Sequence, residues 1–264
     1  MDKCLDICRR IQQVGGQPFV VGGYVRDLLM GRPSNDLDLC VVGMTMPQLL
    51  ATFPEGKAVG KDFPIVIVDD IEIALARKER KMGVGHTAFT CETAGVTLEE
   101  DLMRRDFRMN AIAMNPFTNE FIDPFGGRED VANKRISVIG PHFCEDPLRI
   151  LRACRFAAQL GFNFRASHDT SVYRYANLID YNELKSISPE RIWLETMKAL
   201  RTDKPSLFFE SLNDLYLLDV FFPEIAALQG RVQPEKHHPE GDAYLHTLLV
   251  IDQARELGAN DQTM

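Results

Sequence analysis

Short apolar runs alternate with helical patterns along the first part of the chain. The run at 19–23 is apolar and ends in two glycines, so it predicts a buried strand followed by a turn. Residues 24–31 predict a helix that closes at Gly31. The alternating stretch at 36–43 is rich in β-forming residues and predicts a second strand. Strand, helix and strand in this order indicate a small α/β unit.

The same alternation continues toward residue 140. Residues 46–53 predict a short helix, and 63–80 predict two strands with a tight turn between them. Residues 81–97 have no period and are rich in glycine and polar residues, which predicts a mobile loop. Thr97 and Glu100 have the spacing of a capping box, so the next helix is expected to start there.

Helical patterns dominate after about residue 140, where the strand signals fade. Residues 146–162 have a strong amphipathic pattern, and Ser188 with Pro189 predicts the start of another helix. Further helices are expected at 167–177, 205–213 and 243–257. The chain therefore predicts an α/β part followed by an all-α part, with a boundary near residue 140.

The charge is uneven along the 264 residues. The formal net charge is −8, which by itself argues against nucleic acid as a partner. Residues 134–204, however, hold 12 Lys and Arg against 8 Asp and Glu, while 205–264 hold 3 against 10. A polyanionic partner is therefore not excluded, because the middle of the chain is locally basic.

The composition is that of a globular protein, with 45% apolar and 26% charged residues. No stretch approaches the roughly 18 consecutive apolar residues of a membrane span. The first 16 residues predict an amphipathic helix and not a signal peptide, so a cytoplasmic location is expected. None of the six cysteines forms a CxxC pair, and they are expected to be buried, reduced thiols.

Two aspartates are the first candidate for chemistry. Asp36 and Asp38 are separated by one residue on a predicted strand, so their side chains are expected to share a face. Carboxylate pairs bind hard cations such as Mg²⁺, which also bind substrate phosphates. A lone pair of this kind is usually a polar strand edge, but here Gly23 and Arg26 precede it at a turn into a helix, which favours binding of a triphosphate.

Glu72 is open to two interpretations. It is the second residue of the predicted strand IEIALAR and could be a third carboxylate beside the pair. It could equally be a strand residue that faces solvent, and the sequence does not separate these.

A second motif, RRDFRMNA, contains Arg105, Asp106 and Asn110. Guanidinium groups beside a carboxylate suit the recognition of ribose and phosphate, because guanidinium is a rigid fork of donors. Taken alone, the motif is better explained as an ion pair at a helix end.

A third motif, EDPLRILRACRF, places Asp146 and Arg149 three residues apart on an expected helix, with Arg152 one turn further. A carboxylate next to a guanidinium offers an acceptor and several donors, which together could read a nucleobase. The alternative is an ordinary salt bridge between successive turns.

Three histidines lie near the end of the chain, His237, His238 and His246, together with Asp242. Their spacing could support metal binding, although such clusters are more often structural or incomplete.

Taken together, the motifs resemble those of the class II tRNA nucleotidyltransferases, that is, the CCA-adding enzymes and the related bacterial poly(A) polymerases. The resemblance runs from about residue 19 to about residue 254. It rests on an ordered series of motifs: VGGYVRDLLMG…DLD, ALARKER, EEDLMRRDFRMNAIA, IDPFGG, EDPLRILRACRFAAQLGF, ISPERIW and HPEGDAYLHT.

The resemblance implies an α+β fold. A small mixed-sheet, polymerase-beta-like nucleotidyltransferase head (1–140) would be followed by an all-α neck and body (141–230). Residues 231–264 would begin an incomplete HD-type domain, with His246 a candidate metal ligand. One departure is Arg108, where the family commonly has a small residue.

The resemblance also implies a role for each matching residue. Asp36 and Asp38 would hold catalytic Mg²⁺, and the base of CTP or ATP would pair with Asp146 and Arg149. The remaining nucleotide contacts would come from Gly23, Arg26, Arg105, Asp106, Asn110 and Arg152, and the loop at 81–97 would help the switch from C to A addition.

The implied activity is CCA addition to the 3′ end of tRNA without a nucleic-acid template, with the acceptor arm gripped by the later helices and no membrane involved. Poly(A) synthesis and partial, A-only or CC-only addition are the alternatives within this class. A non-catalytic RNA-binding module is the alternative outside it. The sequence leaves the oligomeric state open.

Overall fold

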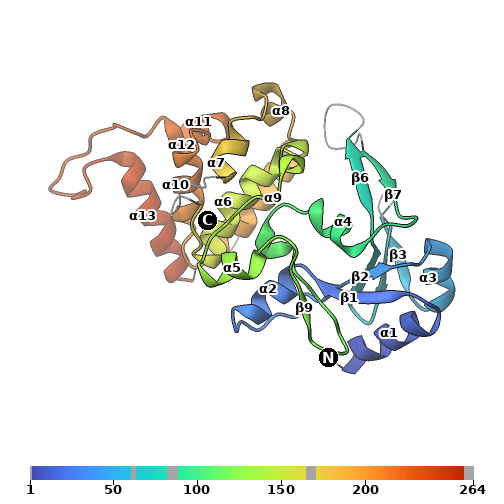
Figure 1. Ribbon diagram of the computed structural model, residues 1–264. Coiled ribbons are helices and arrows are strands. Elements are labelled where there is room, and N and C mark those ends of the chain that lie inside the picture. Colours follow the sequence, from blue (N-terminus) through green and yellow to red (C-terminus); the bar gives the residue numbers. More distant parts are fainter. Residues whose placement is uncertain (1, 61–63, 82–88, 165–170, 259–264) are drawn as a thin grey trace. The chain divides into compact units, whose positions relative to one another are not determined.

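The computed structural model describes residues 2–60, 64–81, 89–164 and 171–258 (Figure 1). The chain divides into two compact units. The head unit comprises Met1–Asn133 and Ser137–Glu145, and the helical unit comprises Lys134–Ile136 and Asp146–Met264. The three-part division expected from the sequence, at 140 and 230, stays a prediction.

A seven-stranded mixed sheet forms the head unit, in the order β3-β4-β5-β2-β1-β8-β9. Strands β2 and β5 pair in parallel, and the other neighbours are antiparallel. The strands are β1 (Gln17–Val21), β2 (Asp38–Val42), β3 (Lys57–Val59), β4 (Ile65–Val68), β5 (Ile71–Leu75), β8 (Ala113–Met114) and β9 (Phe121–Ile122). The expected strands at 19–23, 36–43 and within 63–80 are thus present.

The expected loop at 81–97 is partly wrong. A separate hairpin, β6 (Lys78–Lys81) with β7 (Phe89–Glu92), includes the first residue of the glycine-rich stretch and a segment in its middle. Residues 82–88 lie outside the described residues. The pairing of Lys78 with Glu92 and of Glu79 with Cys91 shows that main-chain hydrogen bonds impose a strand where the side chains have no period.

Short helices complete the head unit: α1 (Asp2–Gln13), α2 (Gly23–Leu29), α3 (Met46–Thr52), α4 (Leu98–Met103) and α5 (Gly127–Ala132), with 3-10 turns at Arg108–Asn110 and Pro141–Glu145. The capping box at Thr97 is confirmed, because its hydroxyl accepts from the Glu100 amide and the Glu100 carboxylate accepts from the Thr97 amide. Helix α4 ends at Met103, so Arg105 follows the helix.

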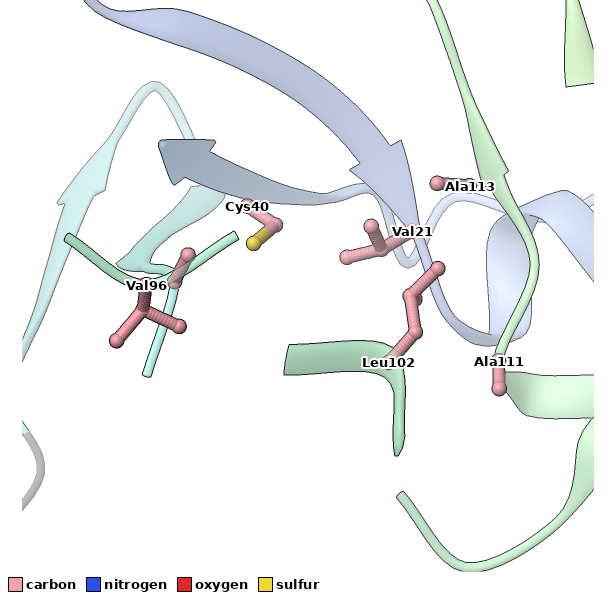
Figure 2. Packing of buried hydrophobic residues seen from close by; sticks show 7 residues of the cluster. Val21, Cys40, Val96, Leu102, Ala111 and Ala113 are labelled. Carbon is pink, nitrogen blue, oxygen red and sulfur yellow. The ribbon is translucent and has the colours of Figure 1, made fainter. Parts of the chain in front are cut away.

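The core of the head unit joins the sheet to α4. Figure 2 shows Val21 of β1, Cys40 of β2 and Ala113 of β8 beside Leu102 of α4. Leu102 is fully buried. Burial of this apolar side chain fixes α4, and therefore the residues that follow it, against the centre of the sheet. Of the six cysteines, none is in a disulfide; Cys91 and Cys144 are half-buried and the other four are buried.

Among the described residues of the helical unit, the regular secondary structure consists of helices. They are α6 (Leu148–Leu160), α7 (Ser171–Ala176), α8 (Tyr181–Lys185), α9 (Pro189–Leu200), α10 (Ser206–Asp214), α11 (Leu218–Phe221), α12 (Pro223–Ala226) and α13 (Ala243–Glu256). Helix α6 packs against α9 and α10, and α10 packs against α13. The helices expected at 205–213 and 243–257 are confirmed. The one expected at 167–177 is shorter and starts at Ser171, and 165–170 lie outside the described residues.

The sequence pattern explains the two long central helices of this unit. The apolar face expected for α6, including Leu151 and Cys154, is buried. The helix ends at Gly161, whose φ of 65° is the left-handed conformation that glycine adopts without strain. Helix α9 begins after Ser188, with Pro189 at its first position, as expected. None of the helices described is long and apolar enough to span a membrane.

Candidate active site

Three carboxylates gather at one end of the central strands in the head unit. Asp38 begins β2, and the parallel register places Glu72 of β5 directly opposite it. Asp36 is exposed and precedes the strand, so the expectation that it lies on the strand with Asp38 is wrong. The charge of Asp36 nevertheless acts on Asp38, together with that of Glu72. Glu72 thus neighbours Asp38 and is also exposed to solvent, so its role as a third carboxylate stays a prediction.

Crowding of negative charge changes the acidity of Asp38. Burial, followed by the charges of Asp36 and Glu72, raises its pKa from 3.8 to about 6, against the opposing charge of Arg105. No described residue donates a hydrogen bond to these three carboxylates or forms an ion pair with them. Crowded carboxylate oxygens without protein donors are the ligands that a divalent cation such as Mg²⁺ prefers, so the residues fit a metal.

A cavity of about 240 Å³ opens beside Asp38 and Glu72. Its other charged lining residues are Arg77, Asp101, Arg104 and Arg105. Gly22 lies beside two of the lining residues. Its φ is 76°, and a Cβ added there would lie 3.3 Å from Arg105 Nη1 and 3.6 Å from Asp38 Oδ2. Glycine is thus needed for both conformation and space. Acidic and basic groups face one volume, as binding of a metal-bound phosphate requires.

The predicted residues Arg26, Asp106 and Asn110 do come together, but they are buried. Arg26 Nη1 donates to Asn110 Oδ1 at 2.8 Å, and its Nε donates to Asp27 Oδ1 at 2.8 Å. Asn110 Nδ2 donates to Asp106 Oδ1 at 3.1 Å. Arg26 is only 4% exposed. Direct contact with phosphate requires its guanidinium to leave these partners, so the structure favours Arg26 as a support for Asn110.

Two arginines follow α4 and share one buried acid. Arg104 donates to Asp101 Oδ1 at 2.7 and 3.0 Å, and Arg105 Nη2 donates to Asp101 Oδ2 at 3.2 Å. Arg104 also donates to Glu79 of β6 at 2.9 Å. Sequence reasoning missed Asp101, although its spacing of three and four residues from the two arginines is a local signal for ion pairs on a helix.

In the helical unit the expected pair of Asp146 and Arg149 is arranged differently. Asp146 lies two residues before the start of α6, whereas Arg149 is the second residue of the helix. Asp146 Oδ1 accepts from the Leu148 amide at 3.1 Å, and Oδ2 accepts from Arg191 of α9 at 2.7 Å. Arg191 belongs to the motif ISPERIW, but it lies 45 residues from Asp146 and no sequence signal paired the two. It is a residue of this site that only the structure identifies.

Another buried ion pair lies in the helical unit. Arg155 Nε donates to Glu195 Oε2 at 2.5 Å, and both side chains are less than a tenth exposed. Arg152, a predicted site residue, lies 3.9 Å from the second oxygen of Glu195 and over the ring of Phe156. The basic cluster of α6 is therefore divided between an internal support, Arg155, and the more exposed Arg152.

His238, Glu240 and His246 form a further group, with ligand atoms within 4.8 Å of one another. The Nδ1 atoms of the two histidines are 3.3 Å apart, and Glu240 accepts from His246. His237 is exposed and outside this group, and Asp242 instead caps α13 by accepting from two amides. The three clustered residues could hold a metal ion of the kind that imidazole and carboxylate bind.

Comparison with known proteins agrees with this arrangement. Residues 18–137 match the poly A polymerase head domain, and 178–229 match the probable RNA and SrmB-binding site of polymerase A. The multifunctional CCA protein of Actinobacillus pleuropneumoniae serotype 5b is 47% identical over 249 residues, which are 92% of this chain and 59% of that protein. The multifunctional CCA protein of Haemophilus influenzae is 44% identical over 247 residues, which are 58% of that protein. The chain thus spans about three-fifths of the length of these curated relatives.

Solved structures show the same fold. The CCA-adding enzyme of Bacillus stearothermophilus in complex with CTP aligns with a TM-score of 0.68 and 34% identity, covering 84% of this chain and 53% of that one. The Thermotoga maritima CCA-adding enzyme complexed with tRNA aligns with a TM-score of 0.64 and 26% identity, covering 82% and 51%. The expected α+β architecture, with a polymerase-beta-like head and a helical region after it, is confirmed. The chain therefore contains a poly A polymerase head domain and the RNA-binding segment matched after it, and it is similar to the CCA-adding nucleotidyltransferases, whose chemistry generally depends on a metal.

Proposed function

We propose that this chain adds C, C and A to the 3′ ends of tRNA, using CTP and ATP and releasing pyrophosphate, in the cytoplasm. The observation that supports this most is the cavity in which Asp38 and Glu72 face Arg105. It supplies metal ligands and a phosphate-binding cation in a chain closely similar to multifunctional CCA proteins.

The head unit binds the reacting groups. Asp36 and Asp38 hold Mg²⁺, which when bound activates the 3′ hydroxyl of tRNA and neutralises the charge that develops on the α-phosphate. Arg105 contacts the triphosphate, because its guanidinium borders the cavity at Gly22. The turn at Gly23 leaves room for the nucleotide beside these groups. Asp106, Asn110 and Arg26 form the hydrogen-bonded support that places the ribose and phosphate contacts.

The helical unit selects the nucleotide in this proposal. Asp146 and Arg149 pair with the base of CTP or ATP, and Arg152 lies beside the nucleotide. Arg191 orients Asp146 for this selection, because it donates a 2.7 Å hydrogen bond to one carboxylate oxygen of Asp146. Protein side chains held in this way replace a nucleic-acid template.

The test uses tRNA transcripts that end at the discriminator base, incubated with Mg²⁺ and labelled CTP, ATP or both. Products are resolved at single-nucleotide length. We expect growth by three nucleotides that then stops, and only when both substrates are present. No extension with CTP, ATP or both, while tRNA is still bound, would contradict catalysis and favour a non-catalytic RNA-binding module.

Poly(A) synthesis or partial CCA addition is the second candidate. The match of residues 18–137 to a poly A polymerase head domain is the observation that favours it. A ladder of added A residues would support polymerase activity, and growth by one A or by two C residues would support partial addition.

A further inference from the structure

Asp101 is an acid buried almost completely in the head unit, at 1% exposure. Burial of an unpaired carboxylate is strongly unfavourable, so its donors are informative. Its oxygens accept from Arg104, Arg105 and the amide of Arg77, the last at 3.2 Å. Burial alone would raise the pKa of Asp101, but the charges of Arg104 and Arg105 outweigh it, and the pKa lies below its ordinary value. Asp101 is therefore a permanent anion that orients guanidinium groups.

The guanidinium of Arg105 is hydrogen-bonded through two of its nitrogens, and the third has no partner in the part of the chain that the structure describes. Its Nη2 donates to Asp101, and its Nη1 donates to the Asn110 carbonyl at 3.4 Å. Its Nε is buried and has no hydrogen-bond partner among the described residues. The guanidinium lines the cavity that also contains Asp38. A rigid fork with an unsatisfied donor beside the carboxylate site is arranged to receive an anionic ligand.

We propose that Asp101 is a positioning residue for the nucleotide, acting through Arg105, which its carboxylate holds in the orientation that meets the triphosphate. This rests on the proposed function, because it takes the cavity to be the triphosphate site. Glu79 extends the support, since it accepts from both Arg77 and Arg104 at 2.8 and 2.9 Å. Hairpin β6–β7 is thereby joined to the same guanidinium cluster.

The test is equilibrium binding of CTP with Mg²⁺ in the absence of tRNA, where no hydroxyl acceptor allows turnover. Asp101→Asn keeps the shape of the side chain and removes its charge. We expect its Kd for CTP to rise on the order of tenfold. In an Arg105→Ala background, which itself weakens binding, the same substitution should add little, because Asp101 acts only through Arg105.

Glu100→Gln is the matched control. Glu100 is the preceding residue of α4, pairs with Lys78 at 2.6 Å and can keep its capping bond as glutamine. Its Kd for CTP should stay unchanged. Thermal melting confirms that each variant is folded, and Asp101→Glu replaces Asp101→Asn if that variant melts below the assay temperature, with the same expectation.

An unchanged Kd in a folded Asp101 variant would overturn the proposal, as would an equal increase in both backgrounds. These outcomes are distinct from failure of the proposed function. If wild type binds CTP but extends no tRNA, the coupling between Asp101 and Arg105 is still measured. If wild type binds no CTP, the cavity is not a nucleotide site and both proposals are wrong.

Discussion

One pair of carboxylates in the head unit and two carboxylates of the helical unit have opposite surroundings. Asp38 and Glu72 lie side by side with no described protein donor, and burial and like charge raise the pKa of Asp38 to about 6. Asp146 and Glu195 are instead each bonded to an arginine, Arg191 and Arg155, at 2.7 and 2.5 Å. The negative charges of Asp38 and Glu72 are unfavourable without a bound cation, whereas those of Asp146 and Glu195 are already balanced by arginines.

Under the proposed function, the difference corresponds to a division of tasks. Groups that bind a metal must keep their oxygens available, which costs stability in the metal-free protein. Groups that read a base must present one fixed pattern of donors and acceptors, which requires internal partners. Substitutions in the two units should therefore change different observables.

The largest effect is expected for Asp38→Ala. Loss of a metal ligand removes several kcal/mol of transition-state stabilisation, so turnover should fall about 10³-fold or more. Single-turnover extension of tRNA measures this, and tRNA affinity from filter binding should be unchanged. Asp70→Ala, in the turn between β4 and β5, is the control that should keep activity. Retention of full activity by Asp38→Ala would refute the metal assignment.

The next largest effect is expected when a buried ion pair of the helical unit is broken. Glu195→Gln leaves the Arg155 guanidinium buried without its counter-charge, which is expected to cost about 3–5 kcal/mol of unfolding free energy. Urea denaturation of the full chain measures it. Glu190→Gln, on the exposed side of the same helix, should change the midpoint little. Equal midpoints for the two variants would show that the Arg155–Glu195 pair contributes no stability.

A smaller effect is expected when Asp146 loses its partner. In Arg191→Gln the Asp146 carboxylate keeps only its bond to the Leu148 amide and is held less firmly, so discrimination of CTP and ATP against UTP should weaken about tenfold. The ratio of kcat/KM values for the competing nucleotides is the measurement. Lys198→Gln removes a positive charge from the same helix, where the side chain is 54% exposed, and should leave the ratio unchanged. Equal ratios in wild type and Arg191→Gln would remove Arg191 from the selection mechanism.

The smallest effect concerns pH. The pKa of Asp38 is about 6 when folded and 3.8 ordinarily, so the metal-free native state binds the extra proton between these values. Stability from this group is therefore highest below about pH 4 and falls as the pH rises through about 6. Because the carboxyl is partly solvated, we expect only about 1 kcal/mol. Thermal melting across this range should show the decline in wild type and its absence in Asp38→Asn; parallel curves would contradict it.

Local order was accessible from the sequence. The capping box at Thr97 and Glu100, the start of α9 at Ser188 and Pro189, and the buried face of α6 were all predicted, because each depends on residues within one or two turns. The limits of this approach appear at Asp36 and at β7. A two-residue spacing did not establish that both aspartates share a strand, and main-chain pairing made a strand without side-chain alternation.

The sequence by itself determined the α/β-to-helical order of the chain and the candidate chemistry of its motifs. Tertiary structure alone decided which groups meet. The parallel register set Glu72 opposite Asp38, and packing joined Arg26 to Asn110 over 84 residues and Arg191 to Asp146 over 45. The physical reason is the distance along the chain over which residues interact. Helix caps and the spacing of apolar residues depend on neighbouring residues, whereas strand order and helix packing depend on how the whole chain buries its apolar side chains.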